Sequence, residues 1–214
     1  MMRDGSDGAE IEAGDVLRFW LEDHGPEDWY RQDDALDAAI RSRFEAAWTV
    51  ARGGGLTTWW RDARGSLAYI VLTDQFPRNM FRDDARAFAT DAPARNAARH
   101  AIDAGHDLAV DGPARQFFYL PFMHSECLAH QDRSCRMFAG RMDAPDNLLH
   151  AQAHRQVIRD YGRFPYRNAA LGRRSTRAEQ AFLDGGSYGE VVRAMRAASD
   201  GAAGPGLSTG AGRG

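Results

Sequence analysis

Lysine is absent from this 214-residue sequence, so all 27 basic residues are arginine. Any site for an anion must therefore use guanidinium groups, which bind carboxylate or phosphate through paired hydrogen bonds. Blocks of like charge are missing too, because the arginines and 30 acidic residues are mixed along the chain and leave a net charge of −3. This balance argues against a nucleic-acid partner and against an anionic membrane surface.

Long apolar runs are also missing, since no segment approaches the roughly 18 apolar residues of a membrane span. The first residues lack the basic and apolar regions of a secretory signal, which favours a cytoplasmic location. Cysteine is scarce, and the pattern places both cysteines, Cys127 and Cys135, in one helix. Eight residues of helix separate them by about 12 Å, too far for a disulfide, so we expect them to be reduced.

Alternation of apolar and polar residues with period two is rare, whereas helical spacing recurs through most of the chain. Residues 33–52 show it clearly, with Leu36, Ile40 and Phe44 on one face. Glycines, prolines and capping residues divide the chain into about eight helices. We predict an all-α protein with one helical domain at residues 15–197. A disordered segment at 1–14 would precede it, and a disordered tail rich in Gly, Ala and Ser would follow at 198–214.

A carboxylate stands on an apolar helical face near the middle of the chain. Asp74 lies seven residues after Leu67 and therefore shares its face, which should be buried. Pro77 is expected to end the helix, which would leave Asp74 in the last turn, where the helix dipole disfavours an anion. The carboxylate then needs a partner. It either pairs with an arginine to fix the turn or lies in a functional cleft.

The turn that follows Asp74 has a second copy. Phe-Pro-Arg-Asn at residues 76–79 is matched by Phe-Pro-Tyr-Arg-Asn at 164–168, preceded by Arg163. If the two turns face each other, the arginines surround one anion and the asparagines donate to it; these residues are Arg78, Arg163, Arg167, Asn79 and Asn168. Alternatively, each Arg-Asn pair satisfies the carbonyls at its own helix end.

Two histidines also fall on predicted helix faces. A helix from Pro121 to about Arg141 would place His124 on its buried stripe, either as a core residue with a satisfied partner or as a site residue. His154 follows His150 by four residues, a spacing that allows two metal ligands. No third ligand or zincin pattern accompanies them, so we expect no metal and regard His154 as an inward-facing polar residue.

Three motifs resemble a known bacterial family. They are LTDQFPRN at residues 72–79, YLPFMHSE at 119–126 and YGRFPYRN at 161–168. The resemblance covers about residues 13–186 and is to a family still classed as a domain of unknown function. It implies a small all-helical fold, a superhelix of the tetratricopeptide kind, but it assigns no activity and leaves any cofactor unknown. Met123 and Cys127 depart from positions that are more often acidic in the family, and His150 has no counterpart there, which argues further against a metal site.

These residues favour a protein of uncharacterised function that binds a small polar or anionic ligand. If the protein is an enzyme, this ligand is its substrate. Asp74 or His124 would be the acid or base. The expected cleft is lined by Asp74, Gln75, Arg78, Asn79, His124, His154, Arg163, Arg167 and Asn168. One alternative is a helical module for a protein or peptide partner, with aromatics exposed along a groove at Trp59, Trp60, Phe117 or Tyr119. A lower alternative is a metalloprotein that uses His150 and His154.

Overall fold

The computed structural model describes residues 11–202, and within them the chain contains α-helices and short helical turns but no strand. The α-helices are α1 (Ala13–Leu17), α2 (Asp34–Arg52), α3 (Ala63–Ile70), α4 (Phe76–Met80), α5 (Asp91–Asp103), α6 (Leu120–Met123), α7 (Leu128–Arg141), α8 (Pro145–Tyr161), α9 (Arg177–Asp184) and α10 (Ser187–Ala202). The predicted all-α fold is confirmed. These ten helices exceed the expected eight because some expected helices are divided.

Both expected ends of the helical domain fall inside helices. Helix α1 begins at Ala13, within the stretch expected to be disordered, and α10 continues to Ala202, beyond the expected boundary at 197. The remaining parts of the two expected disordered segments, 1–10 and 203–214, lie outside the described residues. None of the helices between residues 11 and 202 is long and apolar enough to cross a membrane.

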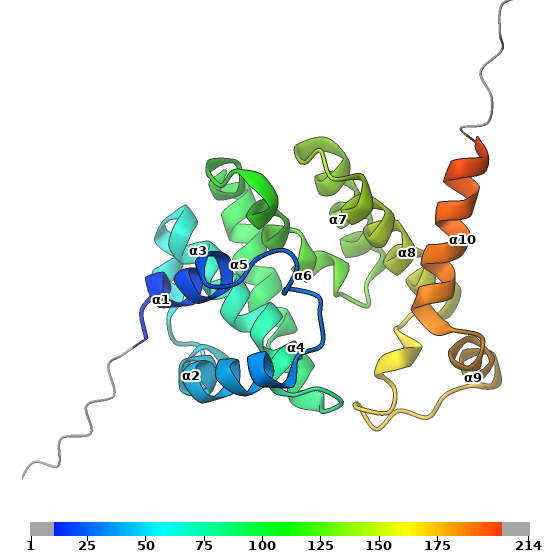
Figure 1. Ribbon diagram of the computed structural model, residues 1–214, viewed down its shortest axis with the longest axis horizontal. Helices are drawn as coiled ribbons and strands as arrows, with labels where there is room; N and C mark the ends of the chain where they lie inside the picture. Colours follow the sequence, from blue (N-terminus) through cyan, green and yellow to red (C-terminus); the bar gives the residue numbers. More distant parts are fainter. Residues whose placement is uncertain (1–10, 203–214) are drawn as a thin grey trace, which may run out of the picture.

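The helix that contains Asp74 does not end at Pro77, contrary to the sequence-based prediction. Helix α3 passes through a π-helical turn at Val71–Gln75 into α4 (Figure 1), and the Phe76 N–H donates to the Val71 carbonyl five residues earlier. Pro77 has no N–H to donate to the Thr73 carbonyl, and the Thr90 hydroxyl donates to that carbonyl at 2.6 Å instead. The helix therefore continues, and Asp74 lies in its middle rather than at a C-terminus.

The prediction of one helix from Pro121 to Arg141 is also wrong, because the structure has two helices in this segment. Helix α6 ends at Met123, and α7 begins only at Leu128, after Cys127 in extended conformation. The buried side-chain amide of Gln131 donates to the carbonyls of Met123 (2.6 Å) and Ser125 (2.7 Å), which the break would otherwise leave unpaired. His124 consequently caps the C-terminus of the short helix α6 and lies in the turn that follows it.

A large aromatic core lies between α1, α2, α3, α4 and the turn at Gly112–Phe118. Phe76 from α4 packs on Trp20, Phe44 and Phe19, with ring centroids 4.8–6.1 Å apart. The burial of each such ring stabilises the fold by roughly 2–3 kcal/mol relative to leaving it exposed. This core fixes the end of the α3–α4 helix that carries Asp74 and Arg78.

The C-terminal helices form a second layer. Helix α7 packs on α8 and α8 on α10, while α9 packs on the short turn Pro165–Arg167 (Figure 1). This succession is compatible with a tetratricopeptide-like superhelix. A separate small core of Val157, Ile158 and Phe164 packs against α9 and α10, whereas Phe138 of α7 belongs to the large core. Helices α9 and α10 join through Gly186 and Ser187, both with positive φ (101° and 55°), a conformation that is strained for serine.

Candidate functional site

The site begins with Asp74, which the π-helical turn carries into the interior with no exposed surface. Its carboxylate accepts a hydrogen bond from His124 Nδ1 at 2.9 Å and another from the side-chain amide of Gln75. The Arg78 guanidinium, one helical turn further on, lies 3.3 Å from the same carboxylate. The buried charge is therefore matched by one cation and two hydrogen-bond donors.

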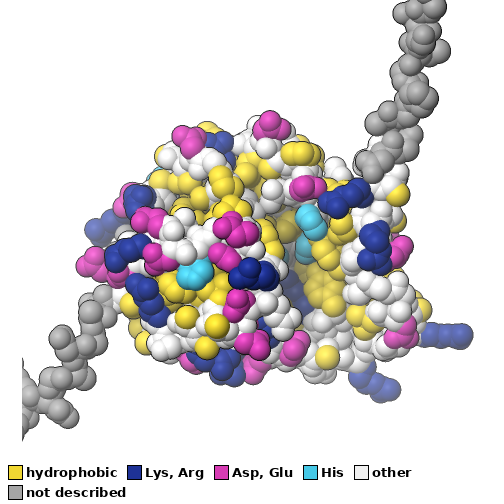
Figure 2. Space-filling view, in the orientation of Figure 1, with side chains coloured by type: hydrophobic (Ala, Val, Ile, Leu, Met, Phe, Trp, Pro, Cys, Tyr) yellow, Lys and Arg dark blue, Asp and Glu magenta, His cyan; other side chains and the backbone are white. Residues whose placement is uncertain are grey.

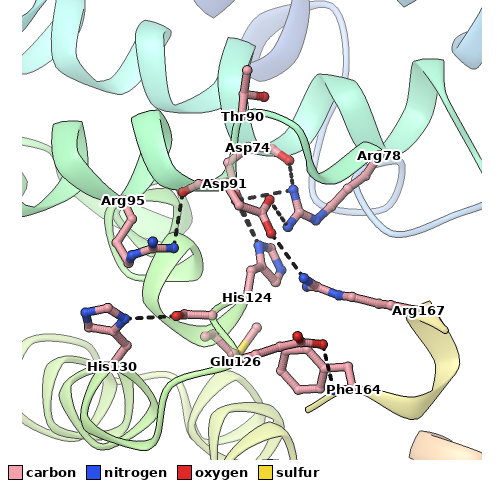
Figure 3. A network of polar contacts seen from close by, with 12 residues as sticks. Asp74, Arg78, Thr90, Asp91, Arg95, His124, Glu126, His130, Phe164 and Arg167 are labelled. Carbon is pink, nitrogen blue, oxygen red and sulfur yellow. Dashed lines mark hydrogen bonds and ion pairs between the residues drawn. The ribbon is translucent and has the colours of Figure 1, made fainter. Parts of the chain in front are cut away.

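Arg78 connects this carboxylate to a second one. Its Nη2 donates to Asp91 at 2.8 Å, and Arg167 Nη1 donates to the other oxygen of Asp91 at 3.1 Å (Figure 3). Asp91 is the first residue of α5, where the helix dipole favours an anion. The Arg167 guanidinium also lies over the rings of Phe88 and Phe164, at 4.5 and 4.7 Å. Two carboxylates and two guanidinium groups thus balance one another.

Asp74 keeps its charge in this network. Burial alone raises the pKa of a carboxyl group, but the charge of Arg78 and the contacts with His124 and Gln75 outweigh it and hold the pKa of Asp74 at about 2. An ionised carboxylate can only accept hydrogen bonds, so His124 Nδ1 carries the proton that the two share. Asp74 therefore fixes both the orientation and the tautomer of the imidazole.

His154 is held in the same way. Its Nδ1 lies 2.9 Å from the His150 carbonyl oxygen, which only accepts, so Nδ1 is again the protonated nitrogen. The rings of His124 and His154 are 6.3 Å apart between centroids. Within the described residues neither Nε2 has a hydrogen-bond partner, and neither is sealed from solvent. Each Nε2 is consequently an unused acceptor.

Both imidazoles are neutral at physiological pH. Burial, reinforced by the charge of Arg78, lowers the pKa of His124 despite the opposing effect of Asp74. Burial, together with repulsion from His124, lowers the pKa of His154 to about 3. A neutral histidine with its Nδ1 proton held by a carboxylate and its Nε2 free has the arrangement that general bases require.

A cavity of about 460 Å³ adjoins the two histidines. It lies between α6, α8, the start of α10 and the segment around Tyr30, and in the view of Figure 2 the surface is hollowed between the main body and the C-terminal helices. The lining residues are Tyr30, Leu120, Met123, His124, Asp146, Asn147, His150, His154 and Tyr188. Its volume lies within the range of small-molecule sites.

The structure brings together part of the set that the sequence predicted. Asp74, Gln75, Arg78, His124 and Arg167 form one contact network, and His154 lies beside His124. The two Phe-Pro turns do approach each other, but their arginines meet through Asp91. The expected space for an anion between Arg78 and Arg167 is thus filled by a carboxylate of the chain itself.

Three predicted residues lie outside this network. Asn79 donates to Asp37 at 2.8 Å, and Asn168 donates to the Ser175 hydroxyl at 3.1 Å. Arg163 binds Glu179, a residue of the capping box that starts α9. Asn79 thus links α4 to α2, and Asn168 and Arg163 bind the segment that leads into α9, so these three contacts are not the bonds to helix-end carbonyls of the alternative interpretation.

Sequence reasoning missed Asp91, Tyr30 and Tyr188. The sequence did contain a signal for Asp91, because Thr90-Asp91 followed by Pro93 is typical of a helix start. The helical pattern of the sequence already begins near Ala87, but the structure has a short 3₁₀ turn there, Ala85–Phe88. The two tyrosines reach the cavity through long-range packing, which no local pattern indicates.

Two other sequence-based expectations can be compared with the structure. Phe117 and Tyr119, expected as exposed groove aromatics of an interaction module, are fully buried, so this expectation is wrong for them. Trp59 and Trp60 are partly buried against the core. Among the described residues, no group of three or more His, Cys, Asp or Glu side chains has the geometry to hold a metal ion.

Comparisons with known proteins are consistent with the motifs. The family described as "Bacterial protein of unknown function (DUF924)" matches residues 16–187. A solved structure of a protein of unknown function from Agrobacterium tumefaciens is 42% identical, with a TM-score of 0.76 over 80% of this chain and 96% of that one. None of the curated proteins compared with the chain matches it.

Proposed function

The chain belongs to this family of bacterial proteins of unknown function, and we propose that it binds a small polar molecule in the cavity beside His124. His124 Nε2 accepts a hydrogen bond from that molecule, and Asp74 holds the imidazole in the tautomer that does so. The two free cysteines support the cytoplasmic location expected from the sequence.

One observation carries the proposal. A fully buried carboxylate orients a neutral histidine whose second nitrogen is unused, and the histidine forms part of the wall of a cavity of suitable size. A histidine that only fills the core does not require a buried carboxylate to orient it, and burying an ionised carboxylate costs free energy. That cost is characteristic of functional sites, where groups are held ready for a ligand.

The arginines have a different role from the one expected. Arg78 and Arg167 do not line the cavity and are paired with Asp74 and Asp91. Arg78 holds Asp74 ionised and so keeps the proton on His124 Nδ1, while Arg167 pairs with Asp91, the second carboxylate bound by Arg78. In this proposal they position His124 and make no contact with the ligand.

A ligand screen by thermal shift tests the proposal. Polar metabolites are screened against the wild-type protein, His124→Asn and the control His100→Asn, which changes an exposed histidine away from the cavity. We expect at least one compound to raise the Tm of the wild type and the control, with little or no effect on His124→Asn. A compound that stabilises all three proteins equally would place binding elsewhere and contradict the proposal.

The tautomer of His124 provides a test that needs no ligand. In a nitrogen–proton correlation NMR spectrum, we expect the His124 proton on Nδ1 at neutral pH. A proton on Nε2 would remove the acceptor and with it the proposed contact.

A further inference from the structure

We infer that the ligand of this cavity is a neutral molecule with an apolar body and two neighbouring hydroxyl donors, one for each imidazole. This inference rests on the proposed function and adds the chemical class of the ligand. Its evidence is the arrangement of donors, acceptors and charges on the cavity wall.

The wall offers two acceptors that are close together. His124 and His154 both use Nδ1 as a donor within the chain, so each presents an unprotonated Nε2. Their ring centroids are 6.3 Å apart, a separation that one small ligand with two hydroxyl groups can span. A ligand that brought only acceptors to these nitrogens would leave both unpaired and would be repelled by their lone pairs.

Most other polar groups of the wall have a partner within the chain, and His150 Nε2 is the exception among the described imidazoles there. The Tyr188 hydroxyl and His150 Nδ1 are 2.6 Å apart, and Tyr30 and Asn147 both donate to the side-chain oxygen of Gln116. The remaining wall includes Leu120, Met123 and the tyrosine rings, which favour an apolar or aromatic body. We therefore centre polar recognition on the Nε2 atoms of His124 and His154, whose rings are neighbours.

The charges of the site exclude an anion as the preferred ligand. No arginine is among the residues that line the cavity, and the nearby Arg78 and Arg167 are paired with Asp74 and Asp91. Asp146, at the rim, is the one charged residue of the lining and is itself negative. An anion would lose its hydration without gaining a cation. The anionic ligand expected from the sequence is not supported.

A cation is disfavoured for a related reason. Burial lowers the pKa of both imidazoles, because a positive charge in this place loses its hydration. An ammonium group bound there would lose hydration in the same way. A hydroxyl group supplies the hydrogen-bond donor without a net charge.

Five single-ring probes separate these features. Catechol has two adjacent hydroxyls, phenol has one, and anisole has the same ring with the donor replaced by a methyl ether. Benzoate is an anion and benzylamine a cation. Binding is followed by the NMR signal of the Met123 methyl group, which lies on the cavity wall, with the Met80 methyl of α4 as a control away from it.

We expect the affinity to fall from catechol to phenol to anisole, by about threefold to tenfold for each lost hydroxyl at neutral pH. Benzoate and benzylamine should bind more weakly than phenol. In His154→Phe, catechol should bind no better than phenol does, and His100→Asn should bind all probes as the wild type does. Because His154 packs on Phe164 and Tyr188, phenylalanine preserves its aromatic contacts.

Failure of this inference differs from failure of the proposed function. If anisole or benzoate shifts the Met123 signal at concentrations as low as catechol does, the cavity binds ligands but the hydroxyl inference is overturned. If no probe shifts the Met123 signal at millimolar concentration, the cavity does not accept small molecules, and both are overturned. A shift of Met80 alone would place binding at another surface and would also overturn both.

Discussion

At the scale of single residues, the site depends on a charge that the chain can keep buried because several groups surround it. Asp74 has one guanidinium and two neutral donors around its carboxylate, and each partner has a second role. Arg78 continues to Asp91, and His124 continues to the cavity. Removal of the charge should therefore affect both stability and the histidine.

We expect Asp74→Asn to lower the free energy of unfolding by about 3 kcal/mol, because a buried ion pair loses one partner. Urea denaturation measures this loss. The matched control is Asp103→Asn, whose carboxylate pairs with Arg133 but is 64% exposed, and it should change stability by less than about 1 kcal/mol. Equal effects of the two substitutions would mean that Asp74 is not held as described.

His154 should make the stability depend on pH below neutrality. Its folded pKa, about 3, is lower than the ordinary 6.5, so the unfolded chain binds a proton more readily. Its contribution is therefore complete above pH 6.5 and is lost as the pH falls from 6.5 toward 3. In His154→Phe the unfolding free energy should fall less steeply over this interval. Urea denaturation at several pH values measures the slopes, and a slope equal to that of the wild type would contradict the burial argument.

At the scale of helices, the segment from Ala63 to Met80 shows how a proline is accommodated inside a helix. The π-helical turn precedes Pro77, and Thr90 at the start of α5 supplies the donor that Pro77 lacks. The same hydroxyl accepts a hydrogen bond from Trp48 at 3.0 Å. The buried Thr90 thus connects α2, the continuous α3–α4 helix and α5.

Thr90→Val should consequently be destabilising by about 2–4 kcal/mol, since it leaves the Thr73 carbonyl and the Trp48 N–H buried without partners. Thr49→Val removes a hydroxyl that bonds to Glu45 on the exposed face of α2, and serves as the control with an expected effect below about 0.5 kcal/mol. Thermal or urea unfolding compares the two. A small effect at Thr90 would show that the helix does not need this donor.

At the scale of the whole molecule, the two layers differ in how much core holds them. The aromatic core of the N-terminal layer includes many fully buried rings, whereas Val157, Ile158 and Phe164 are the buried members of the C-terminal cluster. Many side chains of α10 are exposed, and its junction with α9 is strained at Ser187. Regions with few buried contacts open first.

Hydrogen exchange should reveal this difference. We expect the amides of α9 and α10 to exchange faster than those of α3 and α4, and mass spectrometry of peptic peptides measures both. A ligand bound between His154 and Tyr188 would slow the exchange of α10, because Tyr188 belongs to the cavity wall. Equal exchange in the two layers without ligand would contradict the assignment of separate cores.

The sequence predicted the fold class well and the site in part, for physical reasons. Helical periodicity is a local signal, and it indicated correctly that Asp74 is buried. Proline was read as a helix end because a single-helix argument cannot include Thr90, which lies 17 residues away. The partner of Arg78 and Arg167 was missed for the same reason: Asp91 approaches Arg167 across 76 residues. Such pairings depend on the packing of several helices.

The π-helical turn at Val71–Gln75 also sets the angular relation between the two ends of its helix. Each residue of an α-helix rotates the chain by about 100°, and a π-helical turn contains one residue more than an α-helical turn. Deletion of a single residue within this turn would allow one uninterrupted α-helix and would rotate Leu67 and Arg78 relative to each other by that angle. One of the two ends would then face away from its present neighbours. The extra residue thus allows one helix to contribute Leu67 to the core and Arg78 to the site.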